Sequence, residues 1–447
     1  MTAGGSGDRR ALLVGFAVTN QAVAVAELGR GGTVAVVDDH PTPAARSAAA
    51  GLGLDVIGPT GPGELDAMVA AADVIYPSPG VPDHHPVFAR ARRHGVPVRS
   101  EFDLARELDA RPVVAVTGTD GKTTVITWVD AMLTASGVRS VVAGNVEVPL
   151  VTAIQDPTPQ VFVVEASSFR LAHTDRFEPA VATWLNFGPD HLDAHATVED
   201  YEAAKARIWR DQPADAIAIG NADDPVVAGH LARAPARPVT FGLEAGDYRV
   251  AAGRLIGPAG EDLAGVDELW RAFPHDVANA LAASATARAG GATTAGVRTA
   301  LRSFAGLPHR VTLIGEADGV RFFDDSKATA PHATLAALRG FDSVVLIAGG
   351  RNKGLDLGVL ASGADRVRAV VAIGEAAGEI DRAFAGVRPV VVAGSMNDAV
   401  DRARALARPG DAVLLSPGCA SFDRYGSYAE RGDDFTRAVH DLIGART

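Results

Sequence analysis

Short apolar runs recur along the first part of the chain, and alanine-rich stretches of helical length separate them. The runs are ALLVGFAV (11–18), TVAVVDD (33–39), DVIGP (55–59), DVIYPSPG (73–80) and VPVRS (96–100). Strands that alternate with helices form parallel sheets with right-handed crossovers. The pattern therefore predicts a first α/β domain with a parallel sheet.

The same alternation returns twice. A second set of apolar runs begins at Pro112 with VVAV (113–116), SVVAGNV (140–146), VFVVEASSF (161–169) and VATWLNF (181–187). A third set consists of VRFFDDS (320–326), SVVLIAGG (343–350), AVVAIG (369–374), PVVVAG (389–394) and DAVLLSPG (411–418). GLPHR (306–310) separates helical from strand patterns and marks a boundary. We predict an α/β protein of three domains, 1–108, 109–307 and 308–447, of which the first and third are Rossmann-like.

Composition narrows the class of protein. The chain has 447 residues, 47% hydrophobic and 21% charged, which is ordinary for a globular protein. A formal net charge of −12 argues against a nucleic-acid-binding protein, because phosphate backbones require clustered lysine and arginine. The single cysteine, Cys419, excludes an intramolecular disulfide and fits a reducing compartment.

The N-terminal part has one feature of a secretory signal, because Arg9 and Arg10 precede the first apolar run. That run ends at Thr19 without a convincing cleavage site, so a first β-strand is the better interpretation. No run approaches the roughly 18 apolar residues of a membrane span. We therefore expect a cytoplasmic protein that is not inserted in a membrane.

The segment TGTDGKTT (117–124) directly follows a buried strand and precedes a helical pattern. Glycines at 118 and 121 let backbone N–H groups turn around phosphate oxygens at the start of a helix. Lys122 supplies a positive charge to the β- and γ-phosphates, and the hydroxyl of Thr123 or Thr124 can bind Mg²⁺. The segment predicts a P-loop ATPase-like central domain that binds ATP through Gly118, Thr119, Asp120, Gly121, Lys122, Thr123 and Thr124. An ordinary turn with a capping threonine is the alternative.

Other polar residues follow predicted strands, where parallel sheets bind ligands. Glu165 ends VFVVE and is expected to supply a second protein contact to Mg²⁺, although it could simply cap the next helix. His191 lies in the loop NFGPDHLDAH, and Lys205 lies on a helical pattern where a lone lysine is normally a solvated charge. Asp38 and the turn Ser78-Pro79-Gly80 end strands of the first domain and suit a ribose, a uracil or a diphosphate, and the alternative is that each is simply a turn.

The string TGTDGKTT resembles the phosphate loop of the Mur ligase family, GTNGK[ST]T, with Asp120 in place of asparagine. The family also has N-x-x-x-D-H-x-D, similar to the segment around His191, and Y-x-x-A-K-x-x-I, similar to the segment around Lys205. The resemblance implies that Lys122, Glu165, His191 and Lys205 are catalytic. It implies that Lys205 is carbamylated and helps to bind one of two Mg²⁺ ions. The other residues that it implies as Mg²⁺ ligands are Thr123, Glu165 and His191.

The resemblance also implies where the substrates bind. The residues expected for a UDP-muramoyl precursor are Val18, Thr19, Asp38, Ser78, Pro79, Gly80, Asn145 and Ser167. Further ATP contacts are expected from Asn279, near which Asp276 replaces a family asparagine, and from Arg310 and Asp325. The string LLSPGCASFDRYGSYAERG (414–432) resembles LSPACASFDxFxxFExRG of the D-glutamate-adding members. Glutamate is accordingly expected at Lys327, Thr329, Lys353, Ser421 and Tyr428.

What the resemblance implies is an ATP-dependent amide ligase of peptidoglycan precursor synthesis, which passes through an acyl phosphate and acts as a monomer. Alternatives within the family are addition of L-glutamate to the same acceptor and polyglutamylation of folate, against which the LSPGCASFD string argues. From other classes, a generic P-loop kinase would not need the third domain. A non-catalytic nucleotide-binding regulator is disfavoured because Lys122, Glu165, His191 and Lys205 are all present.

Overall fold

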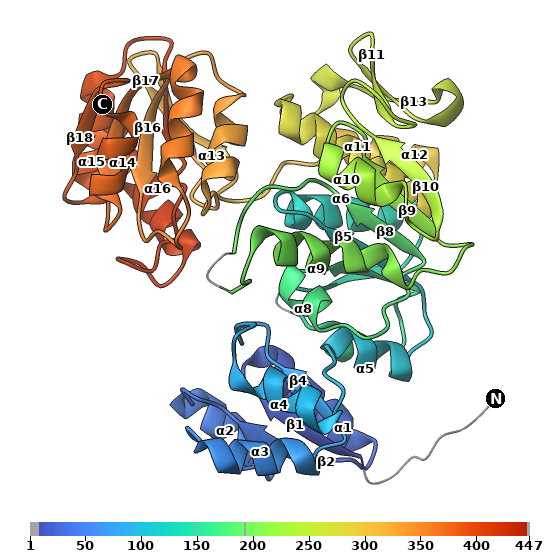
Figure 1. The fold of residues 1–447 in the computed structure, drawn as a ribbon. Helices are drawn as coiled ribbons and strands as arrows, with labels where there is room; N and C mark the ends of the chain where they lie inside the picture. Colours follow the sequence, from blue (N-terminus) through green and yellow to red (C-terminus); the bar gives the residue numbers. More distant parts are fainter. Residues whose placement is uncertain (1–8, 147, 192–193, 445–447) are drawn as a thin grey trace. The chain divides into compact units, whose positions relative to one another are not determined.

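The computed structural model describes residues 9–146, 148–191 and 194–444, which form two compact units. Unit 1 contains the described residues up to 187, together with 194–265 and 279–302. Unit 2 contains the described residues of 188–193, together with 266–278 and 303–444. Figure 1 shows the helices and strands of each unit. The domain boundaries expected after residues 108 and 307 stay predictions.

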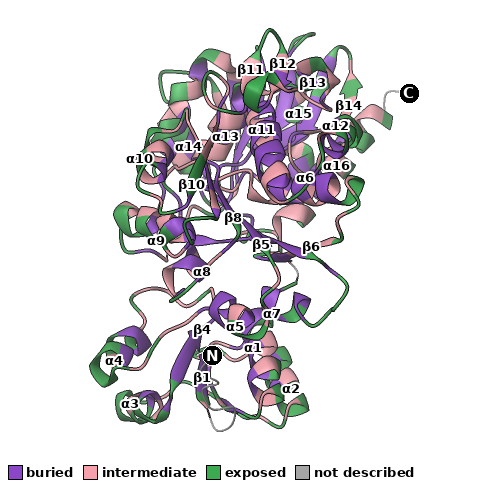
Figure 2. Cartoon of the chain, turned by 90° about the vertical axis from the view of Figure 1, so that its right-hand side faces the viewer, coloured by how far each residue is buried: buried purple, intermediate pink, exposed green. Residues whose placement is uncertain are grey.

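The first sheet of unit 1 is parallel, with strand order β3-β2-β1-β4. Its strands are β1 (Arg10–Val14), β2 (Thr33–Val37), β3 (Val56–Ile57) and β4 (Val74–Pro77). The helices of this region are α1 (Val18–Gly29), α2 (Pro43–Gly51), α3 (Pro62–Ala71), α4 (Pro86–His94) and α5 (Glu101–Leu108). In Figure 2 the strands β1 and β4 are buried, whereas α3 and α4 present exposed faces.

One strand expected here is wrong. VPVRS forms a single bridge, between Val98 and Ile75, and no strand. Pro97 lacks an N–H group for a sheet ladder. Ser100 already caps α5, accepting a hydrogen bond from the Phe102 N–H group while the Asp103 carboxylate accepts one from the Ser100 N–H group. This capping box starts a helix where the apolar pattern suggested a continuing strand.

The second sheet of unit 1 has six parallel strands in the order β10-β9-β8-β5-β7-β6. They are β5 (Val113–Thr117), β6 (Ser140–Gly144), β7 (Val161–Glu165), β8 (Val181–Trp184), β9 (Ile217–Asn221) and β10 (Arg237–Phe241). The associated helices are α6 (Lys122–Ala135), α7 (Leu150–Ala153), α8 (Ser168–Ala172), α9 (Val198–Arg210), α10 (Pro225–Leu231), α11 (Pro274–Ala289) and α12 (Thr294–Ser303). The strand before the phosphate loop is therefore central.

A small antiparallel sheet, which the apolar pattern did not indicate, also belongs to unit 1. Its strands are β11 (Arg249–Ala251), β12 (Arg254–Ile256) and β13 (Asp262–Gly265). Buried side chains of the two parallel sheets meet in one apolar cluster, which includes Leu13 of β1, Phe102 of α5 and Phe162 of β7. The two sheets thus share a core within the unit.

Unit 2 contains a six-stranded sheet of order β14-β15-β19-β16-β17-β18. The strands are β14 (Thr312–Ala317), β15 (Val320–Asp324), β16 (Val344–Gly349), β17 (Val367–Ile373), β18 (Val390–Val392) and β19 (Ala412–Leu415). Its helices are α13 (Pro331–Leu338), the 3₁₀ segment η3 (Leu357–Arg366), α14 (Ala377–Phe384), α15 (Met396–Leu406) and α16 (Tyr428–Gly444). The edge strand β14 is antiparallel to β15, and all other pairings are parallel.

Helices cover both faces of this sheet, as expected for a Rossmann-like domain. One apolar cluster packs α13, η3 and α14 on one face, and another packs α15 and α16 on the other. Cys419 is buried in the first cluster. Among the described residues, no helix of either unit is long and apolar enough to cross a bilayer.

Candidate functional site

The loops after four neighbouring strands of unit 1 meet at the carboxyl edge of the sheet, because the strand ends are in register. Val116 of β5 pairs with Glu165 of β7, and Glu165 pairs in turn with Gly144 of β6. On the other side Thr117 pairs with Trp184 of β8. The phosphate loop, Glu165, Asn145 and the segment after β8 are thereby brought together, as the motifs predicted.

The phosphate loop occupies residues 118–121 and leads directly into α6. Gly121 caps the helix with a φ of +82°, in the left-handed region that favours glycine. A Cβ atom at this position would lie 2.5 Å from the Asn279 Oδ1 atom. Asn279, expected at the nucleotide, therefore packs against the loop, and only glycine leaves room for it.

Asn186 holds this loop by hydrogen bonds to its backbone, and sequence reasoning did not identify it as a site residue. Its Oδ1 atom accepts hydrogen bonds from the N–H groups of Thr119 (3.0 Å) and Asp120 (2.9 Å), and its amide donates to the Asp120 carbonyl oxygen (3.2 Å). Two loop N–H groups are thus already bonded. The N–H groups of the first turn of α6, which have no acceptor within the helix, are the ones suited to phosphate. The sequence offered one indication of this role, because Asn186 is the first residue of the segment that contains His191.

Lys122 folds over the loop it follows. Its ammonium donates to the carbonyl oxygens of Gly118 and Thr119, each at 2.9 Å. This position keeps a positive charge beside the loop. The side chain is half-buried, so it can exchange a carbonyl for a phosphate oxygen without crossing the protein core.

Thr123, Glu165 and Asn145 form one hydrogen-bonded group beside the loop. The Thr123 hydroxyl donates to Glu165 Oε2 at 2.8 Å, and the Asn145 amide donates to Glu165 Oε1 at 3.0 Å. Glu165 is buried and Asn145 is exposed. Hydroxyl and carboxylate oxygens are the ligands that Mg²⁺ prefers. No group of three or more His, Cys, Asp or Glu side chains suited to a metal occurs among the described residues.

Lys205 is buried, and its side chain reaches the phosphate loop. Its Nζ atom donates to the Gly118 carbonyl oxygen at 2.7 Å and lies 4.5 Å from the centre of the Tyr201 ring. The Tyr201 hydroxyl donates to Thr119 Oγ1 at 3.3 Å. The solvated lysine that a helical pattern alone favours is therefore wrong, and α9 places two side chains against the loop.

His191 lies in a loop assigned to unit 2, and its backbone φ is +57°. Its Nε2 atom is 3.4 Å from a carboxylate oxygen of Asp190, and its side chain is 30% exposed. The accessible loop histidine expected from the sequence is confirmed in this respect. Leu192 and Asp193, which complete the predicted string, lie outside the described residues.

The loops of the first sheet bring together the residues expected to bind a UDP group. The Asp38 carboxylate accepts hydrogen bonds from the N–H groups of Phe16 and His40, both at 2.9 Å. Asn20, another side chain that was not predicted to belong to the site, donates to the carbonyl oxygens of Val14, Gly15 and Tyr76, near the ends of β1 and β4. Ser78 begins the Pro79-Gly80 turn at the end of β4, and its N–H group donates to the Val14 carbonyl oxygen at 2.8 Å. Val18 is 61% exposed, so its side chain is available for a ring to pack on.

In unit 2, Asp325 is buried and accepts a hydrogen bond from the Ser416 hydroxyl at 2.7 Å. Burial raises the pKa of Asp325 to about 7, although Ser416, Arg271 and Arg310 oppose the rise. Arg271 donates to the carbonyl oxygens of Arg310 (3.0 Å) and Val311 (2.6 Å). It also forms a two-bond ion pair with Asp276, at 2.5 and 2.9 Å. Asp276, which replaces a family asparagine, is thus paired with Arg271, a contact that sequence reasoning did not find.

The residues expected to bind glutamate are only partly brought into contact. The Lys327 ammonium lies 3.7 Å from the centre of the Tyr428 ring, a cation–π contact. The Tyr428 carbonyl oxygen accepts a hydrogen bond from Ser326 at 2.7 Å. Ser421 is buried, whereas Thr329 and Lys353 are half-buried.

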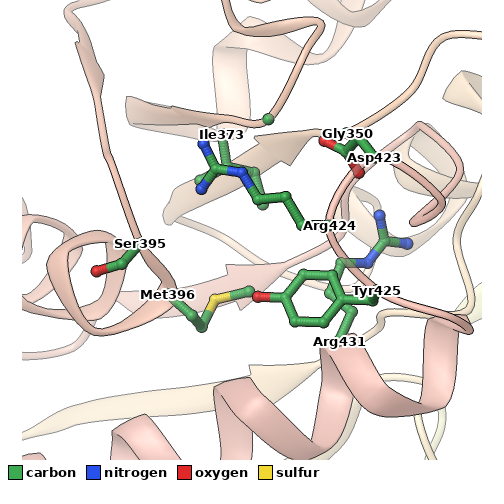
Figure 3. Close-up of a pocket in the computed structure, with 9 residues that line it drawn as sticks. Gly350, Ile373, Ser395, Met396, Asp423, Arg424, Tyr425 and Arg431 are labelled. Carbon is green, nitrogen blue, oxygen red and sulfur yellow. The ribbon is translucent and has the colours of Figure 1, made fainter.

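A small pocket lies beside the same signature in unit 2. Figure 3 shows the Tyr425 ring lying across it, with its hydroxyl end beside Met396. Its lining residues are Gly350, Ile373, Gly374, Ser395, Met396, Asp423, Arg424, Tyr425 and Arg431. Arg431 donates to Ser326 and to the Cys419 carbonyl oxygen, so the arginine of the string fixes the signature loop. None of the five predicted glutamate-binding residues lines this pocket.

Comparison with known proteins agrees with the motifs. Residues 116–287 match the Mur ligase middle domain, and residues 309–419 match the Mur ligase glutamate ligase domain. The chain is 45% identical to the UDP-N-acetylmuramoylalanine--D-glutamate ligase of Frankia casuarinae, over 97% of this chain and 94% of that protein. It is 40% identical to the enzyme of the same name from Shouchella clausii, over 97% of each chain.

Solved structures share the fold at low sequence identity. MurF from Acinetobacter baumannii superimposes with a TM-score of 0.62 and 19% identity, covering 96% of this chain and 93% of that one. A pseudomurein peptide ligase type C from Methanothermus fervidus gives a TM-score of 0.62 at 16% identity, covering 97% of this chain and 100% of that one. On the sequence matches and this shared architecture, the chain belongs to the Mur ligase family.

Proposed function

We propose that this chain joins D-glutamate to UDP-N-acetylmuramoyl-L-alanine and converts ATP to ADP and phosphate, a step of peptidoglycan precursor synthesis. Relatives at 45% and 40% identity over nearly the whole chain have the name of this ligase. The LSPGCASFD string, held in place by Arg431, supports an amino-acid-adding member of the family.

The observation that carries the proposal is the hydrogen bond between Thr123 and Glu165, beside a phosphate loop that Lys122 covers. Thr123 is the second residue of α6, directly after the loop, and Glu165 ends the neighbouring strand β7. This arrangement suits phosphoryl transfer from ATP, which depends on positioning and charge stabilisation. A protein that only binds a nucleotide would not need Lys205 buried against the same loop.

The proposed reaction has two steps. A carboxylate oxygen of the muramoyl-alanine attacks the γ-phosphorus of ATP, ADP leaves, and an acyl phosphate forms. The glutamate nitrogen then attacks the acyl carbon, loses a proton, and displaces phosphate to give the amide. In the first step Lys122 moves from the loop carbonyls to the phosphate oxygens and offsets their charge. The acyl phosphate must be kept from water until the amine arrives.

A Mg²⁺ ion fits Thr123 and Glu165, which supply hard oxygen donors beside the loop, and two ions are proposed in all. When bound, Mg²⁺ withdraws charge from the phosphoryl oxygens. Thr123 and Glu165 would hold one ion. Lys205, if carbamylated, would help to hold the second, and His191 is a further proposed metal ligand. Until an ion binds, Asn145 and Thr123 satisfy both oxygens of Glu165.

Binding roles follow from the same assignment. Val18, Thr19, Asp38 and the turn at residues 78–80 would hold the UDP end of the acceptor, while Asn145 and Ser167 would hold its muramoyl end. Asn279, Arg310 and Asp325 would bind ATP. Lys327, Thr329, Lys353, Ser421 and Tyr428 would bind glutamate. We also propose that the chain acts as a monomer in the cytoplasm, where ATP and UDP-linked substrates are available.

The test is phosphate release from ATP in the presence of UDP-N-acetylmuramoyl-L-alanine, compared with D-glutamate, L-glutamate or no amino acid. Release that depends on D-glutamate is expected. Release only with L-glutamate would keep the mechanism and change the product, whereas no release with either amino acid would favour the non-catalytic nucleotide-binding regulator. Lys122→Ala is the matched variant: it should abolish release and keep affinity for the UDP substrate within a few-fold, and retained turnover would remove the phosphate-loop assignment.

A further inference from the structure

Arg170 of α8 binds three separate segments of unit 1 through its guanidinium. Its Nε atom donates to Glu101 Oε1 at 3.1 Å, its Nη1 atom to Asn145 Oδ1 at 2.9 Å, and its Nη2 atom to Thr19 Oγ1 at 3.0 Å. The arginine is 5% exposed. These partners come from α5, from the loop after β6 and from the start of α1.

Two of these partners are proposed to bind the UDP-linked substrate. Thr19 is the second residue of α1, which follows β1, and Asn145 belongs to the loop after β6. Arg170 therefore joins the first sheet of unit 1 to the edge of the second sheet where the phosphate loop lies.

Arg170 also sets the orientation of the Asn145 amide. A guanidinium only donates hydrogen bonds, so it requires the Asn145 oxygen on its own side. The Asn145 nitrogen is then presented to Glu165, to which it donates at 3.0 Å. If the amide were turned over, its NH₂ group would face the guanidinium and its oxygen would face the Glu165 carboxylate, which is unfavourable at both ends.

Glu101 holds the arginine in place. Its second oxygen accepts a hydrogen bond from the Val151 N–H group at 3.0 Å, and its side chain is buried. Burial raises the pKa of Glu101, while the charge of Arg170 and the N–H groups of Val151 and Leu150 oppose the rise. A planar group fixed by a buried counter-ion loses little freedom when it forms its other bonds.

We propose that Arg170 is a positioning residue, which orients Thr19 and Asn145 toward the UDP-linked substrate and, through Asn145, orients Glu165 for Mg²⁺. The inference rests on the proposed function for the identity of the substrate. It assigns no contact between Arg170 and a reacting atom.

The test compares variants in which the buried charge is balanced. Arg170→Ala combined with Glu101→Gln removes the guanidinium without leaving a carboxylate unpaired in the core. We expect the KM for UDP-N-acetylmuramoyl-L-alanine and the Mg²⁺ concentration for half-maximal activity each to rise about tenfold. The KM for D-glutamate should stay within threefold. Glu101→Gln alone should raise the first two values less than the combined variant does, because the three donors of Arg170 remain although its counter-ion is lost.

Arg106→Ala is the matched control, because Arg106 lies on α5 and donates only to the backbone carbonyl oxygens of Asp109 and Arg111. It should leave the KM values unchanged. If the melting curve shows that the combined variant does not fold, Arg170→Lys is measured by the same criteria. Lysine keeps the charge beside Glu101 but lacks the planar guanidinium.

A KM for the UDP substrate within threefold of wild type would overturn the proposal. So would an equal rise in the KM of every substrate, because a general disturbance of the fold produces that result. Direct binding of the UDP substrate, measured by calorimetry without ATP or glutamate, separates this proposal from the proposed function. Wild-type protein that binds the UDP substrate and releases no phosphate would contradict the function, whereas unchanged affinity in the Arg170 variants would contradict the positioning role.

Discussion

The ammonium of Lys205 donates a 2.7 Å hydrogen bond to the Gly118 carbonyl oxygen, so helix α9 is tied to the first residue of the phosphate loop. Lys205 is 1% exposed. A lysine in this position either contributes its own charge to the site or, once carbamylated, contributes a carboxylate-like group. Removal of the side chain distinguishes the two forms.

Lys205→Ala is expected to lower kcat by about 10²–10³, a range typical for loss of one preorganised charged group. If the lysine is carbamylated, added formate or acetate should partly restore the rate, because a small carboxylate can enter the space left by the side chain. Phosphate-release assays over a range of carboxylate concentrations measure this effect. Lys122→Ala is the control and should not respond. Wild-type rates in Lys205→Ala, or no rescue at any concentration, would discard the carbamate.

Asn186→Ala should weaken the phosphate loop. The Asp120 N–H group loses its side-chain acceptor, whereas the Thr119 N–H group keeps the backbone carbonyl oxygen of Asn186 at 3.1 Å. An unsatisfied donor costs about 1–3 kcal/mol, so we expect a loss of stability in that range and a KM for ATP about tenfold higher. Urea unfolding and initial rates measure the two effects.

Asn186→Asp is the informative companion to that variant. It keeps an acceptor for both loop N–H groups and places a negative charge near the phosphates. Stability should therefore stay within about 1 kcal/mol of wild type while the KM for ATP still rises. An unchanged KM for ATP in both variants would show that the hydrogen bonds of Asn186 to the loop do not affect ATP binding.

Gly121→Ala tests the contact between the loop and Asn279. The substitution forces a residue with a Cβ atom to a φ of +82°, and that atom would lie 2.5 Å from the Asn279 oxygen. Left-handed backbone costs roughly 1–2 kcal/mol for a residue other than glycine, and the contact adds to this. Combining the change with Asn279→Ala should recover part of the lost melting temperature, because the contact disappears and the backbone strain stays. Equal melting temperatures for the single and double variants would contradict the contact.

Local patterns were sufficient for the parts of the site that lie on one segment. The phosphate loop, Glu165 at a strand end and the loop around His191 follow from strand, turn and helix signals within about ten residues. Asn186, Tyr201 and Arg170 could not be found in this way, because their hydrogen bonds join segments that meet only in the folded sheet. The ion pair of Arg271 with Asp276 spans five positions, a spacing that brings no two residues to one face of a helix or strand.

Errors in the predicted elements have equally specific causes. VPVRS has the apolar alternation of a strand, but Pro97 and the capping box at Ser100 override it. The antiparallel edge strand β14 was missed because its pattern, TLIGEA, contains polar residues and a register shift opposite Phe322 and Phe323. The helical pattern alone favours a solvated Lys205, because no helical periodicity indicates that a charged residue is buried, and only the family resemblance places Lys205 at the site.

Asp325 should make ATP binding sensitive to pH. Burial raises its pKa to about 7, so the carboxylate proposed to bind ATP is largely protonated at pH 6. With that pKa the charged fraction falls about tenfold between pH 8 and pH 6, and the KM for ATP should rise by the same factor. Asp325→Asn should have a high KM that does not vary with pH. A wild-type KM that is constant over this range would contradict the role of the charged carboxylate.

His173 should make the folded state less stable as the pH falls. Its ring stacks on Phe88 with centroids 4.6 Å apart, and burial lowers its pKa to about 4 against the attraction of Asp83. Between pH 6.5 and pH 4 the unfolded chain therefore binds a proton that the folded chain excludes. The contribution of His173 to the free energy of unfolding has its full value above pH 6.5 and decreases as the pH falls. The loss between pH 7 and pH 5 should be about 2 kcal/mol.

Urea unfolding at pH 7 and pH 5 measures this loss, and His173→Gln provides the comparison. Glutamine cannot take up a proton, so the variant should lose about 2 kcal/mol less than wild type over the same interval. The pKa of Asp83 is lowered from a value already below 4, so that carboxylate contributes its own pH dependence only in more acidic solution. If wild type and variant lose equal stability between pH 7 and pH 5, the imidazole is not kept neutral by burial in the folded chain.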